Sequence, residues 1–159
     1  MPGRALSGEI EGAMTTVAAT ARVAHLFRAP KKRVPMEALA EAEAIKNLGF
    51  DGCAHARPGG GKRQVLLVDL ETLDSMQLAP GIIRENITTE GLVVNKLPLG
   101  QKLRIGDVQL LVRLVCEPCD ELEKVRLGLK EAMRGKRGML CEVVSGGRIR
   151  RGDTIELLP

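Results

Sequence analysis

Aromatic side chains are nearly absent from this sequence of 159 residues, which contains two Phe and no Trp or Tyr. A folded core must therefore be built from Leu, Val, Ile and Met. Proteins that bind single-stranded nucleic acids by base stacking need aromatic platforms, and the sequence has no recognition-helix pattern either. We therefore expect no nucleic-acid partner.

Long apolar runs are missing as well. No window of about 18 apolar residues could form a membrane-spanning helix, and the N-terminal segment has no apolar stretch of signal-peptide length. These absences predict a cytoplasmic protein with no membrane partner, in a compartment that keeps thiols reduced. The four cysteines are then expected to be metal-binding, catalytic or inert rather than a disulfide framework.

The net charge of +4, from 24 basic and 20 acidic residues, is small. Much of the positive charge lies in three clusters, RAPKKR (residues 28–33), RGKR (134–137) and RIRR (148–151). Clusters of this kind form either a solvated surface or a patch that binds an anionic ligand such as a phosphate.

The order of the predicted elements indicates one mainly β domain with several helices. Residues 1–20 are expected to be a flexible leader and residues 21–159 one domain. Strands are predicted at 21–27 and 65–69, as a hairpin over 97–115, and as a closing hairpin over Gly146 and Gly147. Helices are predicted at 37–50, at 69–81 with Asp69 as the cap, and at 120–138. Short strands at this spacing favour a barrel or a strongly bent sheet.

Two of the cysteines, Cys116 and Cys119, form a Cys-x-x-Cys pair between a predicted strand and a predicted helix. Three functional interpretations remain open: a redox pair, half of a zinc site completed by Cys53 and His55, or a single working thiolate. Cys119 would begin the helix, where exposed N–H groups lower the pKa of a thiol. The pair could also be inert, and Cys141 is expected to be a packing residue.

Two other segments are candidates for a ligand site. The Gly-rich and basic loop at 51–64 is long enough to suggest a functional role. The segment RENITTEG (residues 84–91) gathers hydrogen-bonding side chains around one Ile. Turn chemistry or an oxygen-rich ligand explains that segment equally well.

Five segments are distinctive in combination: GFDGCAHARPGGGKRQVLLVD, PGIIRENITTEGL, LPLGQKLRIGDVQL, CEPC and GKRGMLCEVVSGGRIRRGDTIEL. In this order they resemble a stand-alone bacterial MOSC domain, the domain found at the C-terminus of molybdenum-cofactor sulfurases. The resemblance runs from about residue 21 to the end. It implies a MOSC-type β-barrel. One departure is Cys53 after Gly52, where many members have Gly-Asp, which removes a carboxylate.

The resemblance also implies a function. The key cysteine of the family follows a proline, which places it at Cys119, where it would ligate molybdenum or carry sulfur as a persulfide. Relatives reduce N-hydroxylated compounds with such a molybdenum centre, so the chain would be a molybdenum-dependent oxidoreductase or a sulfur transferase. The residues that would bind the molybdenum cofactor, molybdopterin, are His55, Arg57, Lys62, Arg63, Gln64, Arg84, Glu85, Asn86, Thr88 and Arg137.

The chemistry of the cofactor fits this set. Its phosphate needs Arg and backbone N–H groups, and a soft thiolate suits molybdenum or sulfur transfer. Expected partners are an electron-donating reductase or a cysteine desulfurase, the latter with a pyridoxal-phosphate-linked sulfur donor. The alternatives are a persulfide carrier without molybdenum and a zinc-stabilised interaction module that uses Cys53, His55, Cys116 and Cys119.

Overall fold

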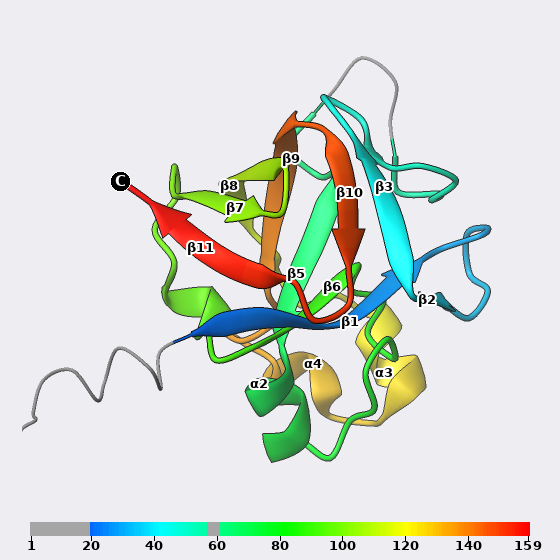
Figure 1. Ribbon diagram of the computed structural model, residues 1–159. Helices are drawn as coiled ribbons and strands as arrows, with labels where there is room; N and C mark the ends of the chain where they lie inside the picture. Colours follow the sequence, from blue (N-terminus) through cyan, green and yellow to red (C-terminus); the bar gives the residue numbers. More distant parts are fainter. Residues whose placement is uncertain (1–19, 57–60) are drawn as a thin grey trace, which may run out of the picture.

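Seven strands close into a barrel in the computed structural model, which describes residues 20–56 and 61–159 (Figure 1). Their order around the ring is β11–β7–β8–β9–β5–β6–β1, and pairing of β1 with β11 closes it. The strands are β1 (Ala21–Arg28), β5 (Val65–Asp69), β6 (Ile87–Glu90), β7 (Lys102–Ile105), β8 (Val108–Val115), β9 (Met139–Ser145) and β11 (Thr154–Leu158). The prediction of a mainly β barrel is confirmed. The leader predicted at residues 1–20 lies, except for Thr20, outside the described residues.

The prediction of a helix over residues 37–50 is wrong. The segment forms β2 (Glu37–Leu39), which pairs with β1, and then β3 (Glu41–Ile45) and β4 (Gly49–Phe50) of a small second sheet. Ala42 and Ala44 are buried while their acidic neighbours are exposed, which is the two-residue alternation of a strand. Tertiary pairing therefore overrides the strong helix propensity of this segment.

The prediction of a closing hairpin over Gly146 and Gly147 is also wrong. β9 pairs with β8 on one side and with β5 on the other, so neither of its edges is free. The next strand, β10 (Gly147–Arg150), therefore leaves the barrel and pairs with β3 instead. A Cβ on Gly146 would lie 2.8 Å from the carbonyl oxygen of Ala44, so the close approach of the two sheets requires a glycine there.

The predicted hairpin over 97–115 is confirmed as β7 and β8, with Leu103 opposite Leu110. The helix predicted at 69–81 is present but shorter, as α2 (Leu70–Ser75), and its predicted cap Asp69 accepts the N–H of Thr72 at 3.1 Å. The predicted helix at 120–138 is broken into α3 (Glu121–Val125) and α4 (Leu129–Ala132) because Gly128 adopts a left-handed conformation between them. A short 3₁₀ helix, η1 (Val94–Lys96), follows β6.

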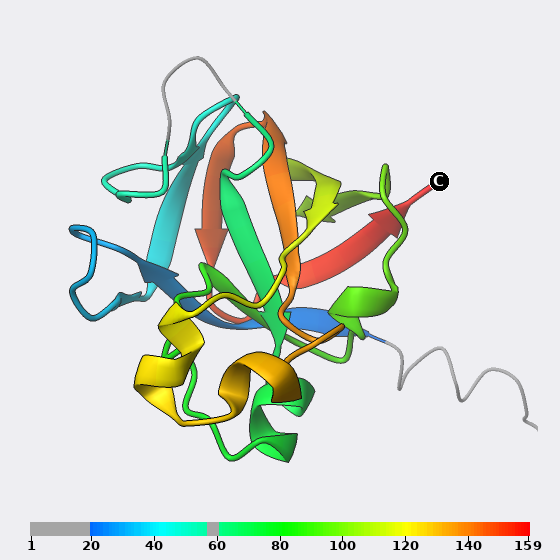
Figure 2. The ribbon, with the colours of Figure 1, turned by 180° about the vertical axis from the view of Figure 1, so that it is seen from behind.

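The core has two parts. Aliphatic residues of the barrel strands, such as Leu67 and Leu110, fill its interior. A second cluster, which includes Ile83, Leu122 and Met133, packs α2, α3 and α4 against one end of the barrel. Figure 2 shows these helices gathered at that end, with α3 and α4 side by side. None of the described helices is long and apolar enough to cross a membrane.

Candidate functional site

The two cysteines of the Cys-x-x-Cys pair lie in different environments. Both are free thiols on the segment from β8 to α3. Cys116 is buried in the helix-covered cluster, and its N–H donates to the carbonyl of Gly138 at 3.0 Å. Cys119 is exposed, and its carbonyl accepts the N–H of Leu122 at 3.1 Å just before α3. An accessible thiol therefore lies beside a sheltered one.

Three basic side chains interact electrostatically with this pair. Burial raises the pKa of the Cys116 thiol, and the positive charges of Arg137 and Arg63 offset part of that increase. Lys130 donates to Asp120 at 2.7 Å, which raises the pKa of Lys130, and the charge of Cys119 adds to this effect. Groups distant in sequence therefore converge on the two thiols. Sequence reasoning selected both arginines but had no signal for Lys130.

Arg137 is the most informative of these groups. The residue is only 8% exposed, and its Nη2 donates to the carbonyl of Ile83 at 2.8 Å. Its Nε and Nη1 are buried and find no hydrogen-bond partner among the described residues. Nearly all buried polar groups in proteins are paired, and an unpaired charged donor is costly. These two donors are therefore the candidate contacts for an anionic group in this region of the protein.

The segment at 84–91 lies next to Arg137 through Ile83. Arg84 has a positive φ of 69° and donates to the carbonyls of Val34 and Lys31, so it ties down the basic loop that contains them. Glu85 is fully buried. Its Oε2 accepts from Thr88 Oγ1 at 2.7 Å and from a backbone N–H, whereas Oε1 has no partner among the described residues.

Two predicted ligand-binding residues have their polar atoms engaged within the protein. Asn86 is fully buried, accepts the N–H of Leu66 at 3.0 Å and donates to the carbonyl of Phe27 at 3.2 Å. Gln64 accepts the N–H of Val143 at 2.9 Å and donates to the carbonyl of a nearby glycine at 2.7 Å. Their positions favour a role in holding the barrel and its loops together.

Cys53 and His55 form a second group, apart from the Cys-x-x-Cys pair. Burial raises the pKa of the Cys53 thiol, but hydrogen bonds from His55 and from the N–H of Ala29 outweigh it and leave the pKa lowered to about 7. Asn86 Nδ2 also lies 3.5 Å from the sulfur. The described residues contain no group of three or more His, Cys, Asp or Glu that could hold a metal ion. The zinc site predicted from Cys53, His55, Cys116 and Cys119 is therefore not formed.

The remaining candidates are less informative. Arg57 lies outside the described residues, and Lys62 is exposed at the start of the segment that enters β5. Burial raises the pKa of Cys141 to about 12, in keeping with a packing residue.

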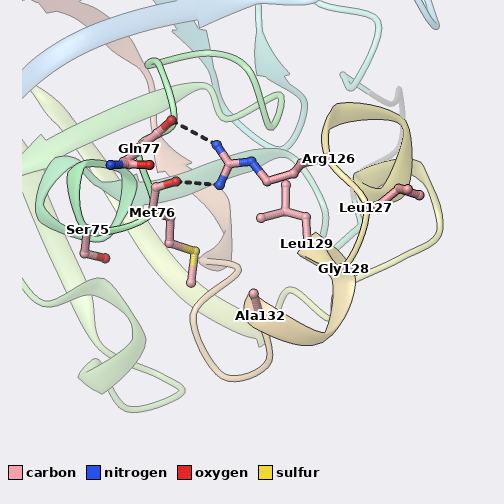
Figure 3. A pocket seen from close by; sticks show the side chains of 8 residues that line it. All are labelled: Ser75, Met76, Gln77, Arg126, Leu127, Gly128, Leu129 and Ala132. Atoms are coloured by element: carbon pink, nitrogen blue, oxygen red, sulfur yellow. Dashed lines mark hydrogen bonds between the residues drawn. The ribbon is translucent and has the colours of Figure 1, made fainter.

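Two surface hollows are lined by none of the predicted site residues that the structure describes. One, of about 310 Å³, lies between α2 and α4, where Arg126 donates to the carbonyls of Met76 at 2.7 Å and Gln77 at 3.1 Å (Figure 3). The other, of about 420 Å³, is lined by residues that include His25 and Arg151. Both hollows are formed by described residues, and neither includes Cys119 or Arg137.

Comparison with known proteins identifies the family. The family model of the MOSC domain matches residues 54–156, more than half of the chain. The chain belongs to the MOSC domain family. This match starts directly after Cys53 and leaves out β1, although β1 closes the barrel. The resemblance inferred from the five sequence segments is thereby confirmed.

Several solved structures share the fold. The YuaD protein from Bacillus subtilis has a TM-score of 0.72 and 20% identity, over 87% of this chain and 95% of that chain. YiiM from Geobacillus stearothermophilus has a TM-score of 0.73 and 20% identity, over 87% and 75%. YiiM from Escherichia coli has a TM-score of 0.62 and 19% identity, over 87% and 68%. No curated protein matches the sequence. At this identity the likeness shows a common fold.

Proposed function

We propose that this MOSC domain binds the molybdenum cofactor, with Cys119 as the residue that contacts molybdenum or a transferable sulfur. The observation that carries the proposal is the pairing of an exposed thiol with a buried guanidinium. Cys119 is exposed, and Arg137, whose charge acts on the neighbouring Cys116, has two nitrogen atoms without partners among the described residues. A ligand that combines a soft metal or sulfur with an anionic group fits both.

The residues present suit such a cofactor. When bound, it would supply a molybdenum centre for redox chemistry or sulfur transfer. Cys119 would provide the soft thiolate ligand. Arg137, whose Nε and Nη1 are unpaired among the described residues, and the exposed Arg63 would supply positive charge for the phosphate. Arg84, Glu85 and Thr88 would position the segment beside Arg137 through the hydrogen bonds described above.

A second candidate function is that of a persulfide carrier without molybdenum. Burial raises the pKa of the Cys116 thiol, but the charges of Arg137 and Arg63 act in the opposite direction and would help to stabilise an anionic sulfur species nearby. In that case the partner would be a cysteine desulfurase, whereas a cofactor-bound reductase would need an electron-donating protein. Both candidates depend on Cys119.

Elemental analysis separates these functions. The full chain, purified from a host that makes the cofactor, is compared with Cys119→Ser and with Cys141→Ala, which removes a buried thiol in β9. We expect molybdenum and pterin in the wild type and the control and neither in Cys119→Ser. A wild type without molybdenum but with a sulfur adduct on Cys119 would support the carrier. Equal molybdenum in the wild type and Cys119→Ser would exclude Cys119 as the ligand.

A further inference from the structure

The surface hollow of about 420 Å³ lies where β1 meets the turn between β10 and β11. Four of its lining residues have charged or titratable side chains: Arg22, His25, Glu90 and Arg151. We infer that this hollow binds the carboxylate group of a small organic ligand, with Arg151 and His25 as its hydrogen-bond donors. None of the residues proposed to bind the cofactor lines the hollow, so the inference is independent of the proposed function.

A β-bulge in β1 places His25 at the hollow. The register of β1 with β6 shifts between Val23 and His25. Val23 and Leu26 are both 1% exposed although they are three positions apart, and the two half-buried residues between them, Ala24 and His25, line the outer face. In a regular strand, His25 would share the inner face with Val23. Bulges often re-aim side chains next to functional sites, and the ring of Phe27, with its centroid 6.1 Å away, stacks on the imidazole.

The position of Arg151 is fixed by the backbone around it and by one of its side-chain nitrogens. The N–H of Gly152 donates to the carbonyl of Val23 at 2.8 Å, and the N–H of Val23 donates to the carbonyl of Asp153 at 2.9 Å, so the turn is fastened to β1 (Figure 1). Nε of Arg151 donates to the carbonyl of Ala24 at 3.0 Å. Its two Nη atoms make no hydrogen bond to the described residues. An arginine can donate in parallel to both oxygens of a carboxylate, which binds it in a defined orientation.

The arginines of the 148–151 cluster differ in their partners. Arg148 pairs with Glu41 at 3.4 Å and with Glu43 at 3.5 Å, and Arg150 pairs with Glu41 at 3.3 Å. Among the described residues, no carboxylate forms a salt bridge with Arg151. The sequence left open whether this cluster is a solvated surface or an anion-binding patch. The structure assigns the first role to the paired arginines and leaves the charge of Arg151 available to an external anion.

The charges around the hollow suit an anion with a single charge. Arg22 and Glu90 pair at 2.9 Å and offset each other, so Arg151 supplies the remaining positive charge among the described residues that line it. Burial, followed by the charge of Arg151, lowers the pKa of His25. Glu85 and Glu90 act in the opposite direction with less effect. The ring is therefore neutral at neutral pH and can donate one hydrogen bond. A phosphate dianion would bring one negative charge more than these residues compensate.

The size of the hollow and one apolar residue indicate what the carboxylate is attached to. A volume of about 420 Å³ falls within the range of small-molecule pockets, which is about 300–1,000 Å³. Leu70, the first residue of α2, lines the hollow with an aliphatic side chain. A small organic acid would place its carboxylate between Arg151 and His25 and its hydrocarbon part against Leu70.

The test uses hexanoate as the probe and its uncharged amide, hexanamide, as the matched control. The chain has two histidines, so the imidazole signals of the full chain in proton NMR report on His25 and, as an internal reference, on His55. The His25 signal is identified by its loss in His25→Gln. Hexanoate should shift the His25 signal in a saturable way and raise the pKa of His25, because a nearby carboxylate favours the protonated ring. Hexanamide should do neither.

Two variants test the role of Arg151. Arg151→Gln should weaken hexanoate binding about 10- to 100-fold, the range expected when a hydrogen bond to a charged group is lost. Arg150→Gln is the matched control, because it removes the same charge from the adjacent residue, which pairs with Glu41 and does not line the hollow. It should leave the binding unchanged. Urea denaturation checks that both variants fold, and the titration of His25 in the wild type stands without either of them.

Several results would overturn the inference. A His25 signal that hexanoate does not move would exclude the site, and an equal response to hexanamide would show that apolar contact alone drives binding. Equal weakening by Arg150→Gln and Arg151→Gln would show a diffuse attraction to the basic surface. Tighter binding of inorganic phosphate than of hexanoate at His25 would contradict the assignment to a carboxylate. Because the experiment needs neither molybdenum nor Cys119, none of these results would bear on the proposed function.

Discussion

Replacement of Arg137 by Met should leave the ligand-free protein about as stable as the wild type, or more stable. The change removes one charged hydrogen bond, to the carbonyl of Ile83, worth about 1.5–3 kcal/mol. It also removes two buried nitrogen atoms that lack partners among the described residues, each of which costs about 1–3 kcal/mol. The free energy of unfolding should therefore change by between about −1 and +4.5 kcal/mol. Urea denaturation in a low-salt buffer without phosphate or sulfate measures it.

Anion dependence completes this prediction. Inorganic phosphate at about 100 times its dissociation constant should stabilise the wild type by about 2.7 kcal/mol and Arg137→Met not at all. Arg134→Met is the matched control, since its side chain is exposed and pairs with Glu131 at the surface, where solvent screening makes such a contact weak. A loss above about 3 kcal/mol in phosphate-free Arg137→Met would refute the reasoning, because only a guanidinium already paired inside the protein costs that much to remove.

Three further changes have defined outcomes. Cys53→Ser should be less stable than the wild type by an amount that grows by up to about 2–3 kcal/mol between pH 6 and pH 9. The pKa of the Cys53 thiol is about 7 in the folded protein, below its value in the unfolded chain, so its ionisation stabilises the fold only as the pH rises above about 7. A difference in unfolding free energy that stays constant with pH in urea titrations would contradict this. Asn86→Ala should cost about 2–5 kcal/mol by the same method, since the buried Leu66 N–H and Phe27 carbonyl lose their partner; a loss below about 1 kcal/mol would argue against these bonds. Gly138→Ala should lower the melting temperature by several degrees, since φ at Gly138 is 107° and a Cβ there would overlap a backbone carbonyl of β5. An unchanged melting temperature would contradict the close approach of Gly138 to β5.

Local signals in the sequence predicted the parts of the fold that depend on local chemistry. The cap at Asp69 and the hairpin of β7 and β8 rest on residues that are neighbours in the chain. The helix prediction for residues 37–50 was wrong because alternating Glu and Ala fit both a helix propensity and the two-residue period of a strand. Only pairing with the partner strand β10 decides between the two structures. The spacing of the short strands favoured a barrel or a strongly bent sheet, and the family resemblance selected the MOSC-type barrel.

The candidate site was predictable in its residues but not in its arrangement. Proline before Cys119 and the basic cluster at 134–137 could be read from the sequence. The sequence could not show that Arg137 is buried against Ile83, which lies 54 positions away. It also could not show that the two halves of the proposed zinc site lie apart. Both facts depend on how the strands close the barrel, which no local pattern records.

The central claim is that Cys119 and Arg137 serve one anion-binding site, and alkylation of Cys119 by a charged and an uncharged reagent tests it most directly. The rate of alkylation of Cys119 is measured with iodoacetate and with iodoacetamide, and the ratio of the two rates is compared between the folded wild type, Arg137→Met and the urea-unfolded chain. A favourable interaction of about 1.4 kcal/mol corresponds to a tenfold change. We predict a ratio several-fold higher in the folded wild type than in the unfolded chain, and a clear fall in Arg137→Met but not in Arg134→Met. Equal ratios in the wild type and Arg137→Met would contradict the account.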